Sequence, residues 1–403
     1  PTAVAVGGTV LDGKDISDVA IGDESACALA TDDTLACWGT DTEGQLGNGA
    51  AGDSDVPTAV AVGGTVLDGA DIVDIDMLHQ HVCALTSTGS IGCWGLGSVG
   101  QLGQGTQLDS DVPVAVATGG SALDAKTVEA IAVGAFNTCA LATDDTMACW
   151  GNRSQGAIGD GGTGNYQLTP ASPLVAGTPL EGKDLLAISN GRYTTCASAT
   201  DGTVACWGEG SKGSLGNGGT DDATTPGAVT TAGTPLAGKV VDQLDGGFDH
   251  VCARTTDGTV ACWGEAYGNG GAGGTDALVP IAPSFSGTSL DGTTAASVTA
   301  GNQRSCAVGS NGGGACWGTG RLGDGSSASS HEPVSVVLSY TAPVTAPTFT
   351  EVTPYEGGMY LAWTGPTDDG GIPPAKHRVR WYTAGPTLVG EQESTNYDLS
   401  LIH

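Results

Sequence analysis

Cys27-ALATDDTLA-Cys37-Trp38-Gly39 is the first of six copies of one motif in this chain. In each copy nine residues separate two cysteines, and Trp-Gly follows the second cysteine. All 12 cysteines take part, and the copies recur at nearly constant intervals, so the chain is built from a repeated unit. The pairs are Cys27 with Cys37, Cys83 with Cys93, Cys139 with Cys149, Cys196 with Cys206, Cys252 with Cys262, and Cys306 with Cys316.

The residues around the motif also keep one order. A strand led by proline, such as Pro57-TAVAV, is followed by a turn, a second strand such as Asp15-ISDVAIG, and the cysteine hairpin. A glycine-rich passage, such as Gly44-QLGNG, leads to the next proline. Four short strands per unit are typical of one blade of a β-propeller. We predict an all-β fold with six visible four-stranded blades at approximately 1–56, 57–112, 113–170, 171–225, 226–279 and 280–338.

The hairpin strands are apolar on both sides. Cys27 and Leu29 face one side of the strand, while Ala28 and Ala30 face the other. A sheet with one wet face would alternate apolar and polar residues, and these strands do not. We therefore expect neighbouring blades to cover both faces of each hairpin. A β-sandwich is the alternative arrangement.

The hairpin turn sets the expected pairing of the cysteines. A three-residue loop at Thr200-Asp201-Gly202 places Cys196 directly opposite Cys206, within the separation that a disulfide tolerates. Paired but reduced thiols are the alternative, and the nine-residue gap does not match structural zinc sites. Disulfides imply an oxidising compartment, so we expect the periplasm, the cell surface or the medium.

Composition limits the classes of function. The 403 residues include 68 glycines but only 5% aromatics, and the net charge is −31. Such an acidic chain would repel phosphates, which argues against a nucleic-acid binder. No apolar run is long enough to span a bilayer. Pro1 begins within a repeat, so we interpret the chain as a fragment whose targeting signal lies elsewhere.

The motif, followed by Gly-Gln-Leu-Gly-x-Gly, resembles the regulator of chromosome condensation repeat in its bacterial, cysteine-bearing form. The resemblance covers residues 1–340; the fifth copy departs from it at Ala266-YGNG, and the sixth at Asn311-GGG. It implies a propeller of seven blades. We expect a seventh blade with inner strands upstream of Pro1 and a closing strand at Pro333–Leu338. A six-bladed ring with a spare strand is the alternative.

The tail has a different pattern. Residues 341–346 form a proline-rich linker, and residues 347–403 resemble the start of a fibronectin type III domain. The features that carry this resemblance are Trp363, the Pro366-TDDGGIP loop and the alternating strand Lys376-HRVRWY. The resemblance implies a partial β-sandwich with Trp363 in its core.

We found no catalytic motif and expect neither enzyme activity nor a cofactor. His81 and His250 occupy one repeat position that other polar residues fill elsewhere, so we place that position on the blade rim. Loop carboxylates could hold calcium, although aspartate is also an ordinary turn residue; they are Asp53, Asp55, Asp109 and Asp111.

The loops that differ most between copies are the expected binding surface. They are residues 152–166, 265–274 and 320–325, and their candidate anchors are Arg153, Tyr166, Tyr267 and Arg321. We expect a secreted or cell-surface scaffold that binds a protein partner. The alternatives are guanine-nucleotide exchange on a small GTPase, inhibition of a secreted enzyme, and a hydrolase or lyase at the propeller's central mouth.

Overall fold

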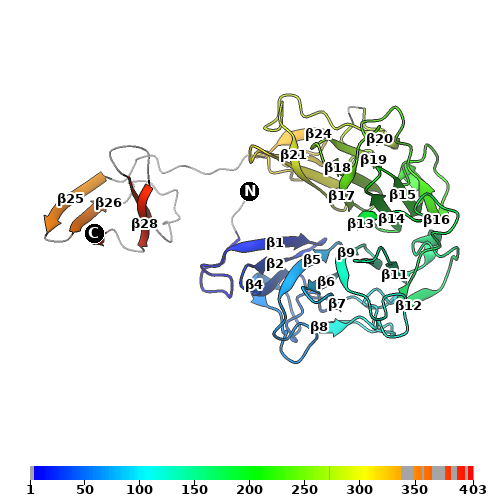
Figure 1. Cartoon of the computed structure of the whole chain (residues 1–403), viewed down its shortest axis with the longest axis horizontal. Helices are drawn as coiled ribbons and strands as arrows, with labels where there is room; N and C mark the ends of the chain where they lie inside the picture. The colour runs from blue at the N-terminus through cyan, green and yellow to red at the C-terminus, as the bar shows by residue number, and fades with distance from the viewer. Residues whose placement is uncertain are drawn as a thin grey trace. The chain divides into compact units, whose positions relative to one another are not determined.

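The computed structural model describes residues 4–271 and 273–336, together with the backbone of five strands within 348–402. The chain divides into two units, Pro1–Val337 and Leu338–His403. The first unit is a propeller of six four-stranded antiparallel sheets, which follow one another in chain order from blue to yellow in Figure 1. The predicted all-β propeller with six blades is confirmed.

The first three blades take their strands in sequence order. Blade 1 contains β1 (Ile16–Ile21), β2 (Ser25–Ala30), β3 (Leu35–Gly39) and β4 (Ser54–Ala59). Blade 2 contains β5 (Ile72–Met77), β6 (His81–Thr86), β7 (Ile91–Gly95) and β8 (Ser110–Ala115). Blade 3 contains β9 (Val128–Val133), β10 (Asn137–Ala142), β11 (Met147–Asn152) and β12 (Tyr166–Ala171), with a 3₁₀ turn at Ser154–Gly156.

The last three blades repeat this order. Blade 4 contains β13 (Leu185–Asn190), β14 (Thr194–Ala199), β15 (Val204–Gly208) and β16 (Ala223–Ala228), with a 3₁₀ turn at Ser211–Gly213. Blade 5 contains β17 (Val241–Gly246), β18 (His250–Thr255), β19 (Val260–Gly264) and β20 (Ala277–Ile281). Blade 6 contains β21 (Ala295–Ala300), β22 (Arg304–Gly309), β23 (Gly314–Gly318) and β24 (Ser330–Ser335).

Our unit boundaries placed the proline-led strand at the beginning of each blade. In the structure this strand is instead the last strand of the preceding blade. Pro57 lies in β4, the outer strand of blade 1, and Pro333 lies in β24, the outer strand of blade 6. Proline has no N–H to donate, so an outer edge strand is where a sheet tolerates it. The expected closure of a seventh blade by Pro333–Leu338 is therefore wrong.

Each cysteine pair lies directly across its hairpin, as the turn predicted. Cys196 is the register partner of Cys206, and the five other pairs repeat this register. The Cα atoms of each pair are 4.0–4.1 Å apart, and all six pairs are disulfide-bonded. The repeat therefore cross-links the two middle strands of every blade.

Five hydrophobic clusters fill the spaces between successive blades. Each cluster joins the disulfide of one blade to the tryptophan of the next; the cluster between blades 2 and 3 contains Cys83, Cys93 and Trp150. Each of the four other clusters likewise contains one cysteine pair and the tryptophan of the following blade. Both faces of a middle blade are therefore covered, as the apolar hairpins predicted.

The second unit contains two antiparallel sheets in its described part. One sheet has the order β25 (Thr348–Tyr355), β26 (Gly358–Thr364) and β29 (Asp398–Ile402), and the other pairs β27 (His377–Tyr382) with β28 (Leu388–Ser394). The linker at 341–346 lies outside the described residues, as do the whole Pro366-TDDGGIP loop and the side chain of Trp363. The fibronectin resemblance stays a prediction.

Candidate functional site

The antiparallel order of the blade brings two loops per blade to one end of the propeller. We call residues 22–24, 78–80, 134–136, 191–193, 247–249 and 301–303 the mouth loops; they join the inner strand of each blade to the second strand. The outer loops join the third strand to the fourth. Backbone hydrogen bonds tie the two kinds together, as from Thr40 N to Glu24 O (3.0 Å) and from Glu209 N to Tyr193 O (3.0 Å).

Four aromatic side chains from the mouth loops gather around the propeller axis. The His79 ring centroid lies 5.3 Å from that of Phe136 and 5.9 Å from that of Phe248, which comes from blade 5. Phe136 stacks on Tyr193, with centroids 5.4 Å apart. All four rings are partly exposed. Blades 2 to 5 therefore share one aromatic cluster at the mouth.

Charged side chains surround this cluster. The Arg192 guanidinium lies 5.4 Å from the centroid of the Tyr193 ring and forms ion pairs with Glu209 (3.3 Å) and Asp249 (3.0 Å). Burial is the main cause that raises the pKa of Asp249. Asp23 lies 3.4 Å from Nε2 of His79. The mouth thus combines partly exposed rings and an arginine with several carboxylates. Aromatic residues and arginine are enriched among the residues that contribute most binding energy at protein interfaces.

Backbone hydrogen bonds between blades hold the mouth loops in place. Asp23 N donates to His79 O (3.4 Å), Ala135 N to Gly191 O (3.0 Å), and Arg192 N to Phe248 O (3.2 Å). These bonds do not depend on side-chain identity, so the loops can vary without moving. A cavity of about 250 Å³ opens beside them, lined by Asp23, Glu24, Gln45, His79 and Gln80.

Below the mouth, polar side chains of the inner strands cap the free backbone groups of neighbouring inner strands. Asp76 accepts a hydrogen bond from Val133 N (2.6 Å), and Asp245 accepts one from Ala300 N (3.1 Å). Asn190 donates to Ala132 O (2.7 Å). Each inner strand is an edge of its sheet, and such edges need their unpaired groups satisfied or covered.

Burial raises the pKa of these inner-strand carboxyls. The pKa of Asp245 rises to about 7 and that of Asp74 to about 6, mainly through desolvation. The pKa of Asp76 is also raised, first by desolvation and further by the charge of Asp245 from blade 5. Because Asp76 and Asp245 already bind backbone N–H groups, their position is explained by strand capping without a catalytic role.

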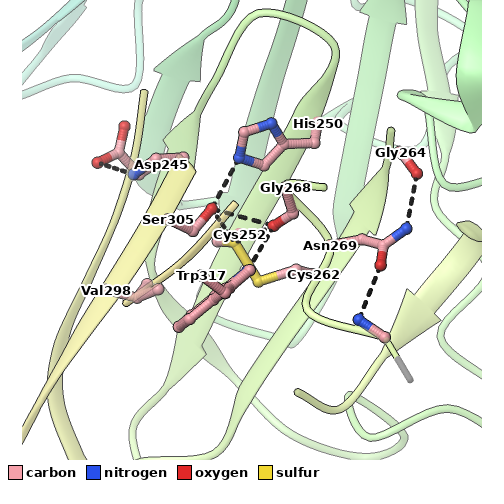
Figure 2. The surroundings of a disulfide bond; sticks show 12 residues. Asp245, His250, Cys252, Cys262, Gly264, Gly268, Asn269, Val298, Ser305 and Trp317 are labelled. Carbon is pink, nitrogen blue, oxygen red and sulfur yellow. Dashed lines mark hydrogen bonds between the residues drawn. A yellow bond between two sulfur atoms is a disulfide. The ribbon is translucent and has the colours of Figure 1, made fainter. Parts of the chain in front are cut away.

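His81 and His250 do not lie on the rim, and that prediction is wrong. Their exposed fractions are 0% and 1%, and burial lowers their pKa values to about 3 and about 4. Figure 2 shows His250 directed at Ser305 of blade 6, with Nε2 2.7 Å from Oγ. His81 makes the same contact with Thr138, at 2.9 Å.

These histidines belong to hydrogen-bond networks that join neighbouring blades. Ser305 Oγ donates to Gly268 O (3.0 Å), the same carbonyl that accepts the Nε1–H of Trp317 (2.7 Å; Figure 2). The serine hydrogen is therefore committed, so Nε2 of His250 must carry the proton that it shares with Ser305. The Nδ1 atoms of His81 and His250 have no partner among the described residues.

The four residues chosen as partner anchors lie in or beside the outer loops of three blades. Arg153 pairs with Asp160 (2.7 Å), Tyr166 begins β12 and is 46% exposed, and Tyr267 stacks on His331 with centroids 4.0 Å apart. Arg321 is exposed. No described hydrogen bond, ion pair or ring contact joins any two of the four. They flank the mouth and do not form one site.

The aspartates considered for calcium have backbone partners in two cases. Asp53 accepts a hydrogen bond from Asp41 N (2.9 Å), and Asp109 accepts one from Gly97 N (2.7 Å). Within the described residues, no three His, Cys, Asp or Glu side chains are grouped to hold a metal ion. The described part of the chain also contains no helical segment with the length and hydrophobicity of a membrane span.

The repeat matches a known family at several positions. Family models of the regulator of chromosome condensation (RCC1) repeat match the chain. One covers residues 88–141, and a second covers residues 16–45, 128–157 and 241–269. The RCC1 repeat predicted from the cysteine motif and its glycine-rich passage is confirmed at these positions.

Curated relatives are similar to the chain over part of their length. The ultraviolet-B receptor UVR8 of Arabidopsis thaliana is 29% identical over 265 residues, which are 65% of this chain and 56% of UVR8. The human E3 ubiquitin-protein ligase HERC2 is 30% identical over 246 residues, 60% of this chain and 5% of HERC2. The chain therefore spans little more than half of one relative and a small part of the other.

Solved structures share this propeller fold at low sequence identity. Human WBSCR16 matches with a TM-score of 0.69 and 18% identity, covering 81% of this chain and 82% of WBSCR16. Prp20p of Saccharomyces cerevisiae matches with a TM-score of 0.66 and 18% identity, covering 85% and 81%. Its structure was reported with its binding to Gsp1p and histones.

Proposed function

We propose that the propeller is a non-enzymatic scaffold that binds a protein partner at its mouth. The observation that carries this proposal is the cluster of His79, Phe136, Tyr193 and Phe248. The chain has only four phenylalanines, and two of them are partly exposed at this one place. Aromatic rings and arginine supply much of the binding energy at protein interfaces, so their concentration on the axis favours a binding surface.

The opposite end of the propeller supports this choice by contrast. There, lysines of the blade connections pair with aspartates of the hairpin turns in four blades. The pairs are Lys14–Asp32, Lys126–Asp144, Lys183–Asp201 and Lys239–Asp257. This end repeats itself, whereas the mouth loops differ from blade to blade. A surface that recognises one partner is expected to differ between copies.

A site-specific crosslink tests the proposal. A photo-reactive residue replaces Tyr193 at the mouth, or Lys183 at the opposite end as the matched control. We expect the Tyr193 position to capture a partner that Lys183 does not. Binding of that purified partner should then be lost in Arg192→Ala and retained in Lys183→Ala, by surface plasmon resonance. Equal binding by both variants would place the interface elsewhere.

We also propose a secreted or cell-surface location, because six disulfides persist only in an oxidising compartment. The predicted fibronectin type III domain would suit such a protein, and the order β25-β26-β29 beside the pair β27-β28 is compatible with part of a sandwich. Non-reducing mass analysis of protein from its native source should find six intact bridges. Reduced thiols there would argue for the interior of the cell.

Guanine-nucleotide exchange is the second candidate, because the RCC1 repeat resembles that of eukaryotic exchange factors. It needs a partner inside the cell, where the bridges would be reduced. Release of a labelled nucleotide from purified small GTPases distinguishes the two functions. Acceleration by the chain, lost on Arg192→Ala, would favour exchange over the scaffold proposal.

A further inference from the structure

The mouth loops carry an excess of negative charge. In chain order they read GDE, LHQ, GAF, GRY, GFD and GNQ, with the carboxylates Asp23, Glu24 and Asp249 and one basic residue, Arg192. Arg192 is already engaged by Glu209 at 3.3 Å and Asp249 at 3.0 Å, and its Nε is buried without a partner among the described residues. The mouth loops therefore present uncompensated negative charge to whatever docks on them.

Two of these carboxylates have no basic side chain beside them other than a histidine. The oxygens of Asp23 lie 3.4 Å from Nε2 of His79 and 3.4 Å from Nδ2 of Asn302, and Glu24 accepts a bond from the Thr40 hydroxyl at 3.4 Å. Neither carboxylate is paired with a lysine or arginine within the described part of the chain. These contacts are longer than the usual range of about 2.7–3.2 Å, so both carboxylates can accept stronger bonds from a cation.

Both carboxylates line the cavity beside the mouth loops. Its volume is about 250 Å³, and its other lining residues are Gln45, His79 and Gln80. Pockets that hold a whole small-molecule ligand commonly measure about 300–1,000 Å³, so this cavity suits a single side chain better than a cofactor. Its lining is rich in acceptor oxygens and contains no lysine or arginine. A side chain with several hydrogen-bond donors and a positive charge is complementary to it.

The cavity also adjoins the aromatic cluster. His79 belongs to both, and its ring centroid lies 5.3 Å from that of Phe136 and 5.9 Å from that of Phe248. Ring faces attract cations within about 6 Å, and the cluster already holds one cation in this way, since the Arg192 guanidinium lies 5.4 Å from the Tyr193 centroid. A guanidinium has a flat face that stacks on rings and a planar fork of donors that matches a carboxylate. Rings beside carboxylates therefore favour arginine.

We propose that the partner docks through a basic segment, and that an arginine side chain of this segment enters the cavity lined by Asp23 and Glu24. This inference rests on the proposed function, because it names the chemistry of the partner at the same mouth. The guanidinium donates to the two carboxylates, and apolar residues beside the arginine cover Phe136 and Phe248. Lysine fits less well, because its ammonium group is more strongly hydrated and has no planar face.

An acidic or phosphorylated segment does not suit this surface. It would meet the three mouth-loop carboxylates, and the arginine among them is already held by Glu209 and Asp249. The net charge of −31 acts in the same direction over longer distances, since it attracts a basic partner and repels an acidic one during approach. Local and long-range charge thus agree on the sign of the partner.

Peptides selected from a random library on the full chain test the proposal. A counter-selection against Arg192→Ala retains those that bind at the mouth. We expect the retained peptides to contain an arginine with an apolar neighbour. Replacing that arginine by citrulline, which keeps its shape and removes its charge, should weaken binding to the parent chain by about tenfold or more in isothermal titration calorimetry.

Two double variants locate the arginine. Asp23→Asn combined with Glu24→Gln should weaken the arginine peptide by a similar factor and leave the citrulline peptide unaffected, because each change removes the same interaction. Asp144→Asn combined with Asp201→Asn removes equal charge at the opposite end and should bind both peptides as the parent does. Thermal unfolding checks that both variants fold. Equal weakening by the two double variants would trace the effect to overall charge and contradict the proposal.

The possible results separate this inference from the proposed function. Mouth-binding peptides that lack arginine, or that bind equally well with citrulline, would overturn the inference and leave the scaffold intact. A library that yields no peptide dependent on Arg192 would also overturn it. If Tyr193 then captured no partner by crosslinking either, the scaffold proposal would fail as well.

Discussion

At the scale of single residues, hydrogen bonds between neighbouring blades explain the repeat position of His81 and His250, which looked interchangeable in the sequence. Where the residue before the first cysteine of a blade is Thr138, Thr195 or Ser305, the preceding blade supplies His81, Asn137 or His250 to bind its hydroxyl. Where that residue is Val82 or Val251, the preceding blade has a short hydroxyl residue. The two positions therefore vary together.

Buried histidines should make stability depend on pH. The unfolded chain binds a proton on each histidine near pH 6.5, whereas folded His81 and His250 resist protonation until about pH 3 and about pH 4. The histidine contribution to stability should therefore be constant above pH 7 and fall as the pH drops from there toward 4. His81→Asn, which copies the side chain that blade 3 has at Asn137, should flatten this fall in urea titrations at pH 7.5 and pH 5. An undiminished fall would show that His81 is not responsible.

The tryptophan hydrogen bond gives a second prediction with its control inside the chain. Trp207→Phe removes the donor to Ala157 O in a fully buried site and should cost about 1–3 kcal/mol of unfolding free energy. Trp38→Phe removes no such bond and should cost less than about 0.5 kcal/mol. Urea denaturation followed by circular dichroism measures both. Equal costs would mean that the bond contributes nothing beyond packing.

The aromatic mouth was missed at this scale because its rings come from two variable positions of the repeat. His79 and Phe248 share one alignment column with Asp23 and Arg192, whereas Phe136 and Tyr193 fall in the next column. Their convergence on the axis is a property of the ring, which a single unit does not display. A usable signal was nonetheless present, since a chain with four phenylalanines places two of them in mouth loops.

At the scale of elements, the cysteine register could be predicted because a short turn fixes which residues face each other across a hairpin. The assignment of the proline-led strand to its blade could not be predicted. Pro57 is followed closely by the next inner strand in sequence, and nothing in the local pattern shows that the chain crosses between blades there. Assigning the proline to an edge strand would have corrected the boundary.

Removing a disulfide should have different effects in different blades. The two bridges that we compare each have a sequence separation of 10, so loop closure should contribute about 3 kcal/mol in either blade. Replacing Cys139 and Cys149 by alanine also leaves a cavity in a packed core, whereas Cys306 and Cys316 face an open side. We expect the first double variant to unfold at lower urea than the second. Equal midpoints would indicate that the blade 6 face is already covered.

At the scale of the whole molecule, the ring brings acidic residues from opposite blades together. The charge of Asp245 in blade 5 helps to raise the pKa of Asp76 in blade 2, after desolvation, and the mouth loops of the same two blades bring His79 and Phe248 together. The chain also carries a net charge of −31, so like charges are concentrated both inside and outside the propeller. Self-repulsion of this kind weakens a compact state.

The buried carboxyl of Asp245 should give stability a pH dependence opposite to that of the buried histidines. An unfolded aspartate ionises near pH 4. Folded Asp245 keeps its proton to about pH 7, because its buried carboxylate would be poorly solvated. The unfolded state therefore holds fewer protons between these values, and the contribution of Asp245 to stability decreases as the pH rises through them. Asp245→Asn removes the charge and keeps an oxygen for the bond from Ala300 N.

We expect Asp245→Asn to be more stable than the parent at pH 8, with the difference shrinking toward pH 4, in urea titrations across that range. Asp257→Asn is the matched control of opposite sign, because hydrogen bonds from Thr255 and Lys239 lower the pKa of that exposed carboxyl. Its ionised form is the one that the fold favours, so the control should lose stability at pH 8 and recover in acid. If Asp245→Asn instead lost stability at pH 8, the axial carboxylate would be stabilising the ring, and capping of the neighbouring strand would outweigh desolvation.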